Sequence, residues 1–306
     1  MSQLPVSVGD VSAQQRFIAA HRSFLLEFPK LKSTLEMLID ESHKKISEQR
    51  GNVTDASQTD EHIAKPIVFS LARATYDDFS ELLVLAGNGM GVGATKVLRS
   101  IYERLVTAMY IAKKPSEARL FMEQSAIERG KIINRYKAVV PDRLAEDFTA
   151  ENLEEIQQKF TEANAQRKVD FCKTCGQPKN QEAWTRVSLD TMAKEVSQQL
   201  FDAYATCYLQ PTYLIHATPT GLDFRVRFIE GGWEYKHLSE PEAHGAVMRG
   251  HFLMLAVLSH LNVYFEIGRD DEVRSRFEAF NPIWEEKSPA RHPVSSSSSG
   301  SGPAKH

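Results

Sequence analysis

Cysteine is scarce in this chain, with three residues in 306. Three cysteines are too few for a disulfide framework and are consistent with a reducing compartment. No apolar run approaches the roughly eighteen residues that span a bilayer, and residues 1–10 lack the basic and apolar segments of a secretory signal. A charge excess is also missing, because 37 Lys and Arg face 40 Asp and Glu. We therefore expect a cytoplasmic protein with no membrane contact and no general attraction to nucleic acid.

Helical periodicity dominates what is present. The composition, 42% hydrophobic and 25% charged, is typical of a soluble chain that can bury a sizeable core. Two alternating segments around Gly231 and Gly232 interrupt the helical pattern and indicate a hairpin. The sequence predicts an all-α helical bundle with a small β-hairpin insertion. Its expected helices cover residues 11–28, 31–50 (after a break at Pro29), 61–86, 94–113, 115–139, 142–167, 188–207 and a last long one at 241–267.

The chain divides into three predicted regions. Residues 1–60 form an N-terminal helical extension. Residues 61–282 form the bundle core, which includes a cysteine loop at about 168–183 and the β-hairpin at about 223–238. Residues 283–306 are rich in Ser, Gly and Pro and are expected to be a disordered tail.

The strongest candidate for chemistry is a charged pair on the predicted helix that ends at Lys113. At about 100° per residue, Arg99 and Glu103 fall at the edge of the apolar sector, near Tyr110. A pair at such an edge is partly desolvated, which suits a functional site. The alternative is a surface ion pair worth roughly 0.3–0.5 kcal/mol, although Arg before Glu is the poorer order for such a pair.

His216 closes a second helical run, four residues after Thr212. Projection through the kink at Pro211 places it on the side of Phe201, so we expect it to point inward. An imidazole at a helix C-terminus is more easily protonated, which suits a general acid or a phosphate contact. The alternative is a core histidine satisfied by a carbonyl or by Glu103.

Residues 82–262 resemble a group of uncharacterised bacterial all-helical proteins. That group has an Arg-x-x-x-Glu helix, a Trp followed by a short helix like Trp184 and Val187–Glu195, and a Tyr-rich helix that closes in Ser-x-x-x-His-Gly. Here the last motif reads Thr212-x-x-x-His216-Ala217, with Thr in place of Ser and Pro211 before it. The resemblance favours Arg99, Glu103 and His216 as catalytic residues. Thr212, Tyr110 and Tyr208 are then the candidate binding residues.

These proteins look like distant relatives of HEPN helical domains, many of which are RNases in toxin and phage-defence systems. Such enzymes use an Arg-x4-6-His motif, in which histidine assists attack of the RNA 2′-hydroxyl and arginine supports the phosphate charge. The literal match, Arg16 to His21, lies in the first predicted helix, whereas that motif lies late in its domain. We therefore interpret it as a chance match.

Other motifs have simpler explanations. Cys172 and Cys175 resemble one zinc knuckle, but a structural zinc site needs four ligands, so a reduced pair is favoured and no metal or cofactor is expected. His244 and His251 share a helix face at i,i+7 and are interpreted as polar packing. The glycines of segment 87–93 fit a tight turn between helices better than a phosphate cradle, because no strand precedes them.

Two functions remain open. The first is a HEPN-like, metal-independent RNase in a toxin or defence context, with RNA as partner. The second is a non-catalytic helical module that binds a protein partner or a nucleotide. The hairpin, with Arg225, Arg227 and Trp233, could contact RNA or be a solvated cover. Together with the apolar late helix it could also form a self-complementary patch, so a homodimer is expected.

Overall fold

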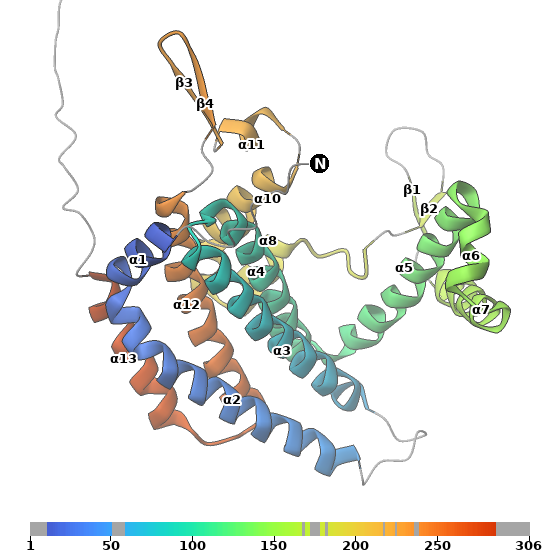
Figure 1. Ribbon diagram of the computed structural model, residues 1–306. Coiled ribbons are helices and arrows are strands. Elements are labelled where there is room, and N and C mark those ends of the chain that lie inside the picture. Colours follow the sequence, from blue (N-terminus) through green and yellow to red (C-terminus); the bar gives the residue numbers. More distant parts are fainter. Residues whose placement is uncertain are drawn as a thin grey trace, which may run out of the picture.

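The chain folds into a helical bundle from which one arm and one hairpin project (Figure 1). The computed structural model describes residues 11–50, 59–166, 169–171, 178–180, 183–216, 218–223, 225–235 and 239–285. The predicted all-α class is confirmed. The bundle contains α1 (Val11–Ala20), α2 (Arg22–Arg50), α3 (Asp60–Gly87), α4 (Gly91–Lys113), α8 (Leu189–Val196), α9 (Gln198–Tyr204), α10 (Gln210–Ile215), α12 (Glu240–Tyr264) and α13 (Asp270–Glu285).

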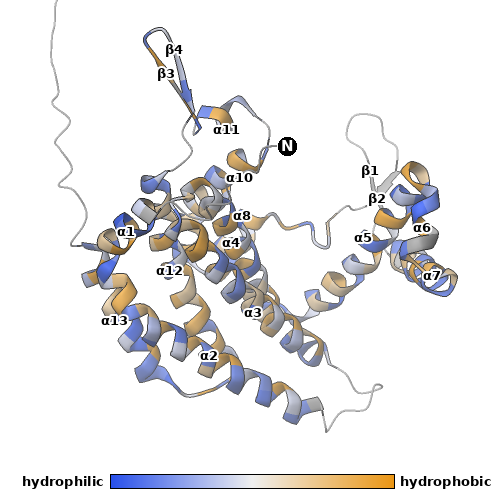
Figure 2. Ribbon diagram, viewed as in Figure 1, coloured by the Kyte–Doolittle hydropathy of each residue, from blue (hydrophilic) through white to orange (hydrophobic). Residues whose placement is uncertain are grey.

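Three long helices, α3, α4 and α12, pack directly against one another at the centre. Each of these helices buries its apolar residues in the core, and apolar and polar residues alternate along the helices of the bundle and the arm (Figure 2). The fully buried side chains at this centre include Phe79, Leu98, Tyr102 and Leu258. Helix α2 contributes Leu31, Leu35 and Leu38 to the same core.

Helix α12 is also long and apolar enough to cross a membrane, judged by length and composition alone. In the structure, however, 61% of its most apolar window is buried inside the protein. That burial is the expected state of the core helix of a bundle.

The end of α12 is tied to the start of α13 by one buried amide. Asn262 donates to Asp270 at 2.7 Å and accepts from the backbone N–H of Arg269 at 2.7 Å. At the other end of α13, the Trp284 indole N–H donates to His251 Nδ1 at 3.1 Å. These bonds fix α13 along α12. The prediction that the helix ending near 267 is the last one is therefore wrong.

Two predicted helix boundaries differ from the structure. Pro29 lies inside α2, so the predicted break there is wrong, and the boundary between α1 and α2 lies instead at His21. The face formed by Phe24, Leu31 and Leu35 remains packed through Pro29, which outweighs the backbone bond that proline removes. Residues 142–167, predicted as one exposed helix, form two, α6 (Pro141–Asp147) and α7 (Ala150–Gln166).

The glycine-rich segment is the tight turn between α3 and α4 that the sequence predicted. Gly89 has a φ of 75°, a left-handed conformation that glycine adopts without strain. Its carbonyl accepts the backbone N–H of Ser239 at 3.0 Å. A Cβ on Gly91 would lie 2.0 Å from the Ser239 carbonyl oxygen and 2.4 Å from the Ala243 nitrogen. Gly91 therefore lets the start of α4 touch the start of α12.

The arm consists of α5 (Ala118–Val139), α6 and α7, which lead away from the bundle (Figure 1). A one-turn 3₁₀ helix, Pro115–Glu117, precedes α5. Gly130 of α5 faces Phe160 of α7 so closely that a Cβ there would lie 2.2 Å from the ring. The segment after α7 contains a small hairpin, β1 (Val169–Phe171) with β2 (Pro178–Asn180), where the sequence predicted only a loop.

The predicted β-hairpin at about 223–238 is confirmed. It pairs β3 (Val226–Ile229) with β4 (Gly232–Tyr235) in antiparallel register, Val226 opposite Tyr235 and Phe228 opposite Trp233. The short helix α11 (Pro219–Asp223) leads into it. The hairpin stands out from the end of the bundle (Figure 1).

Candidate functional site

Arg99 of α4 is held by an aromatic ring. Its guanidinium donates to the Tyr208 hydroxyl at 3.2 Å, and its Cζ lies 4.8 Å from the centroid of the same ring. The Arg99 Nε is buried without a hydrogen-bond partner. Glu103 lies one turn on, with a carboxylate oxygen 3.8 Å from the Arg99 guanidinium. The side chains are 24% and 50% exposed, so the predicted edge position is confirmed.

Tyr208 reaches Arg99 through an irregular helix. Residues Ala205–Leu209 form a π-helical turn between α9 and α10. The Thr212 hydroxyl donates back to the Tyr208 carbonyl at 2.6 Å, so this predicted binding residue is used inside its own helix. The structure thus joins Arg99 to Glu103 and Tyr208, and joins Thr212 only to the backbone of Tyr208.

Tyr110 belongs to a neighbouring, closed group. It is 1% exposed, receives a hydrogen bond from Lys114 at 3.2 Å and packs edge-on against Trp184. Tyr102 is fully buried and donates to the Leu200 carbonyl at 2.7 Å, and burial raises the pKa of its phenol. Neither tyrosine presents a free surface to a ligand.

His216 lies at the exposed end of α10, so the expectation that it points inward is wrong. The projection assumed a constant 100° per residue, and the π turn at Ala205–Leu209 changes that phase. Cys207, Pro211 and Leu214 occupy the buried face instead. Helices α4 and α10 do pack together, but within the described part of the chain no hydrogen bond or ion pair joins Glu103 to His216.

Glu103 opens into a cavity of about 410 Å³ between α3, α4 and α5. We call it the Glu103 cavity. Its polar wall contains hydroxyl, amide and carboxylate groups, and its apolar wall contains two aromatic rings. The residues that line it are Leu71, Ser100, Glu103, Arg104, Thr107, Phe121, Gln124, Ser125, Glu128 and Trp184.

Two interactions set the charge of the Glu103 cavity. Arg104 forms an ion pair with Asp78, which neutralises the arginine. Glu128 accepts a hydrogen bond from Gln124, a neutral partner, at 2.8 Å. With Arg104 compensated, the cavity presents the carboxylates of Glu103 and Glu128, the first partly balanced by Arg99. In the aromatic wall, Trp184 packs edge-on against Phe121 at 5.3 Å.

A second cavity of about 410 Å³ contains the Arg16 to His21 match, which was interpreted from the sequence as a chance one. Arg16 and His21 both line it, together with His244 of α12. The His21 Nδ1 lies 3.0 Å from the Phe17 carbonyl, which can only accept, so Nδ1 carries a proton. In the neutral pair, the His21 Nε2 then accepts from the His244 Nδ1 at 3.2 Å. The interpretation of Arg16 to His21 as a chance match did not anticipate that His21 meets His244 beside Arg16. The Arg-x4-His spacing and the presence of His244 were the only signals in the sequence.

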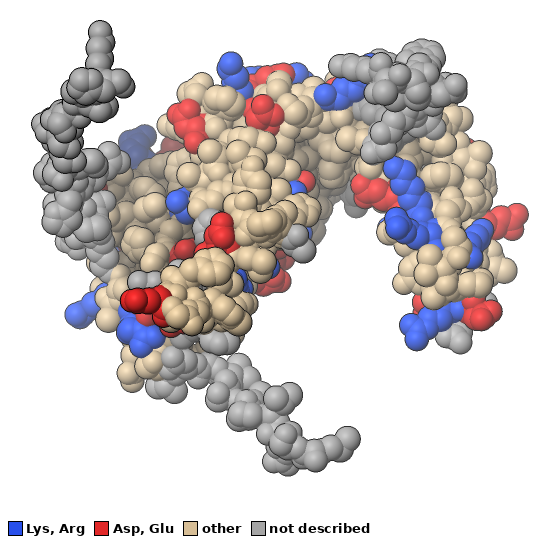
Figure 3. Space-filling view, turned by 90° about the horizontal axis from the view of Figure 1, so that it is seen from above, with Lys and Arg blue, Asp and Glu red and all other residues tan. Residues whose placement is uncertain are grey.

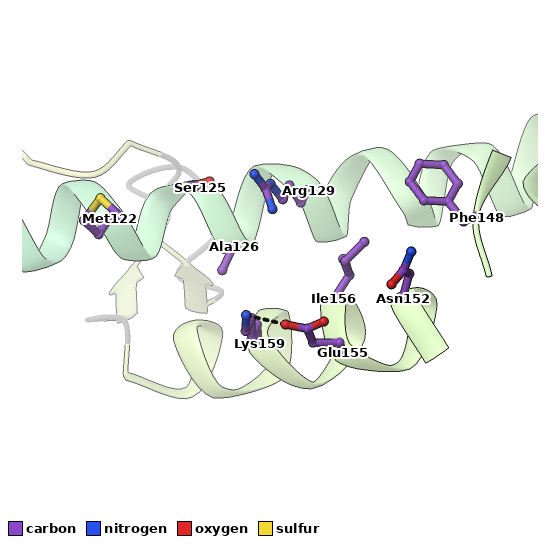
Figure 4. Close-up of a pocket in the computed structure, with 9 residues that line it drawn as sticks. All are labelled: Met122, Ser125, Ala126, Arg129, Phe148, Asn152, Glu155, Ile156 and Lys159. Carbon is purple, nitrogen blue, oxygen red and sulfur yellow. Dashed lines mark hydrogen bonds and ion pairs between the residues drawn. The ribbon is translucent and has the colours of Figure 1, made fainter. Parts of the chain in front are cut away.

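A third cavity, of about 490 Å³, lies on the arm between α5 and α7 (Figure 4). Lys159 and Glu155 form an ion pair at 2.6 Å along α7, on the side that faces Arg129 of α5. The lysine lowers the pKa of the Glu155 carboxyl. This ion pair and the apolar side chains beside it stabilise the packing of two exposed helices. We therefore assign the cavity no chemistry.

Metal ligands do not converge in the described parts of the chain, where no group of three or more His, Cys, Asp or Glu could hold an ion. Cys172 and Cys175 lie outside the described residues. Cys207 is buried and free, and burial raises the pKa of its thiol to about 11. It is therefore a core residue rather than a nucleophile.

Comparison with known proteins gives one finding. The model of a protein family matches residues 65–232, which is more than half of the chain. The match runs from α3 through the arm to β4 and includes Arg99, Glu103, Thr212 and His216. No curated protein and no solved structure matches the chain.

Proposed function

Because the chain belongs to the DUF5677 family, a family of unknown function, we propose its function from geometry alone: it is a non-catalytic helical module that binds a protein partner. The Glu103 cavity receives a basic side chain of that partner. The observation that carries this proposal is that Glu103, half exposed, opens into a cavity with a second carboxylate, while Arg99 is turned to Tyr208.

Charge selects a cation over a nucleotide for this cavity. Phosphate groups would meet Glu103 and Glu128, and the one arginine in the wall is already paired with Asp78. A guanidinium or ammonium group would be attracted to both carboxylates.

The aromatic wall supports the same ligand chemistry. Trp184 and Phe121 line the cavity together with its polar side chains. A planar guanidinium can stack on such a ring and donate to a carboxylate at the same time, which a simple ammonium does less well. Arginine is therefore the preferred side chain of the partner.

Binding of a fluorescein-labelled hexa-arginine peptide, measured by fluorescence anisotropy, tests the proposal. Glu103→Gln and Glu128→Gln should each weaken binding about 3- to 10-fold, the equivalent of roughly 0.7–1.4 kcal/mol. Glu123→Gln is the matched control, because it removes the same charge from α5 at a residue that does not line the cavity. Equal weakening by all three variants would reduce the effect to net charge and end the proposal.

An HEPN-like, metal-independent RNase of bacterial toxin or defence systems is the second candidate. The observation in its favour is that α10, whose C-cap is the exposed His216, packs directly on α4, the helix that carries Arg99 and Glu103. If this function is correct, His216→Ala should lower RNA cleavage about 100-fold and leave unfolding nearly unchanged. If the wild-type chain cleaves none of several RNAs, the non-catalytic binding module remains as the proposed function.

The setting of this module is also part of the proposal. We infer that it acts in the cytoplasm as a homodimer. The near-neutral charge and the burial of α12 support a soluble setting, and the exposed apolar residues of the β3–β4 hairpin support self-association.

A further inference from the structure

The cavity that contains Arg16, His21 and His244 is not used by the proposed function. It lies between α1, the turn after α3 and the first turns of α12. We call it the alanine cavity, because its walls are mostly the smallest side chains. Apart from its charged residues and histidines it is lined by Ala13, Phe17, Ala20, Ala86, Gly89 and Ala243. Such walls leave room for the apolar body of a ligand and offer it no hydrogen bonds.

Polar groups lie at two places in the alanine cavity. Arg16 and Glu240 form an ion pair, with side chains 49% and 57% exposed, at the solvent-facing rim. His21, 4% exposed, forms the inner end with His244, and Trp284 packs against both rings. The ligand that fits has one polar group at the rim and an apolar body inside.

A negative polar group finds a partner in this cavity when it displaces Glu240 from Arg16. Arg16 is the cation of the rim, and the two imidazoles can gain a proton but cannot carry negative charge. The cavity also lies at the start of α12, a helix of 25 residues whose Ser239 N-cap makes no side-chain cap bond. The positive end of that helix attracts an anion, and its first turn already carries the carboxylates of Glu240 and Glu242, with which a ligand would compete. Glu240 is the single opposing charge among the residues that line the cavity.

We propose that the alanine cavity is a second binding site, specific for a small amphipathic carboxylate. The carboxylate takes the place of Glu240 as partner of Arg16, and the aliphatic or aromatic body lies between the alanines and Phe17. An RNA strand does not suit these walls, because ribose hydroxyls and base edges would lose their hydrogen bonds to water there. The site is independent of the Glu103 cavity, so either can fail alone.

Displacement of the fluorescent anion 1-anilinonaphthalene-8-sulfonate by decanoate tests the site on the full chain. Ala20→Phe fills the mouth of the cavity from an exposed position and should weaken decanoate binding about tenfold or more, about 1.4 kcal/mol. Ala19→Phe adds the same ring to the same helix at an exposed residue that does not line the cavity, and should bind as the wild type does. Equal affinities of the two variants, or no displacement from the wild type, would overturn the proposal.

Substitution of the two rim residues tests whether the polar group of the ligand is negatively charged. Arg16→Gln should weaken decanoate binding, because the carboxylate loses its partner, and Glu240→Gln should strengthen it, because the competing carboxylate is gone. Decan-1-ol and decyltrimethylammonium should displace the probe less well than decanoate. Equal displacement by the three compounds would show a site selective for apolar bulk alone, and would overturn the carboxylate assignment.

Discussion

At the scale of single residues, polar side chains far apart in sequence meet in the folded chain. Arg99 meets Tyr208, and His21 meets His244, across 109 and 223 residues. Sequence spacing placed Arg99 and Glu103 correctly, because both lie on one regular helix. It could not show that His21 and His244 meet, because no local pattern relates residues on two distant helices.

His251 gives this scale a prediction about pH. The ring is 1% exposed, is packed among Phe24, Phe280 and Trp284, and accepts a hydrogen bond from Trp284. Burial lowers its pKa to about 4. Between pH 6.5 and 4 the unfolded chain therefore binds a proton that the folded chain does not.

The stability contributed by neutral His251 should be present above pH 6.5 and be lost as the pH falls toward 4, by an amount on the order of 3 kcal/mol. Urea unfolding between pH 7.5 and 4.5 measures this loss. His251→Gln keeps a hydrogen-bond acceptor for Trp284 but removes the titrating ring, so this variant should lose less stability over the same pH range. His43→Gln removes an exposed histidine and is the control. A pH dependence that His251→Gln leaves unchanged would contradict the burial of a neutral ring.

At the scale of elements, the boundaries of regularly periodic helices were predicted well, whereas the positions of residues after an irregular turn were not. Helices α3, α4 and α5 begin and end within a few residues of the predicted positions, because their apolar residues keep a constant phase. The π turn at Ala205–Leu209 shifts that phase, so His216 could not be placed. Helix α13 carries Val273, Phe280 and Trp284 on one apolar face, a helical pattern that the prediction of a last helix ending near residue 267 did not use.

Gly91 tests the packing of α4 on α12. A methyl group there would strike backbone atoms of Ser239 and Ala243, which cannot turn away, so Gly91→Ala should destabilise the fold by about 2 kcal/mol or more. Gly93→Ala is the matched control in the same helix. Its Cβ would meet the Leu85 methyl groups at 3.6 Å, an ordinary contact, so it should be neutral or stabilising. Equal urea midpoints for the two variants would contradict this contact.

At the scale of the whole molecule, a packed bundle carries two projecting parts. The family match covers α3, α4, the arm and the first part of the hairpin but not α1 or α12. The Glu103 cavity therefore lies inside the matched residues, whereas most of the alanine cavity is built by helices that flank them. Lys and Arg are interspersed with Asp and Glu over the face of bundle and arm shown in Figure 3, which agrees with the near-neutral composition.

The β3–β4 hairpin should mediate a homodimer. Its register places Val226, Phe228, Trp233 and Tyr235 on one face, with Phe228 79% and Trp233 65% exposed. A two-stranded hairpin is only marginally stable in water, so cover on that face would stabilise it. Light scattering at high micromolar concentration should give a dimer, and Phe228→Ser with Trp233→Ser a monomer.

Ile229→Ser is the control for the hairpin, because it removes an exposed apolar side chain from the opposite face. This variant should remain a dimer. A monomeric wild type under the same conditions would contradict the assembly, and would leave the Glu103 cavity unaffected.

The most direct test of the central claim is the affinity of the hexa-arginine peptide for Arg99→Gln. If the Glu103 cavity receives a cation, Arg99 competes with the ligand for Glu103 at 3.8 Å. Its removal should then tighten binding about threefold, by roughly 0.7 kcal/mol, whereas Glu103→Gln weakens it. If Arg99 instead serves an anionic ligand such as RNA, Arg99→Gln should leave peptide binding unchanged or weaker and lower the affinity for a single-stranded RNA. That second result would contradict the proposed binding module.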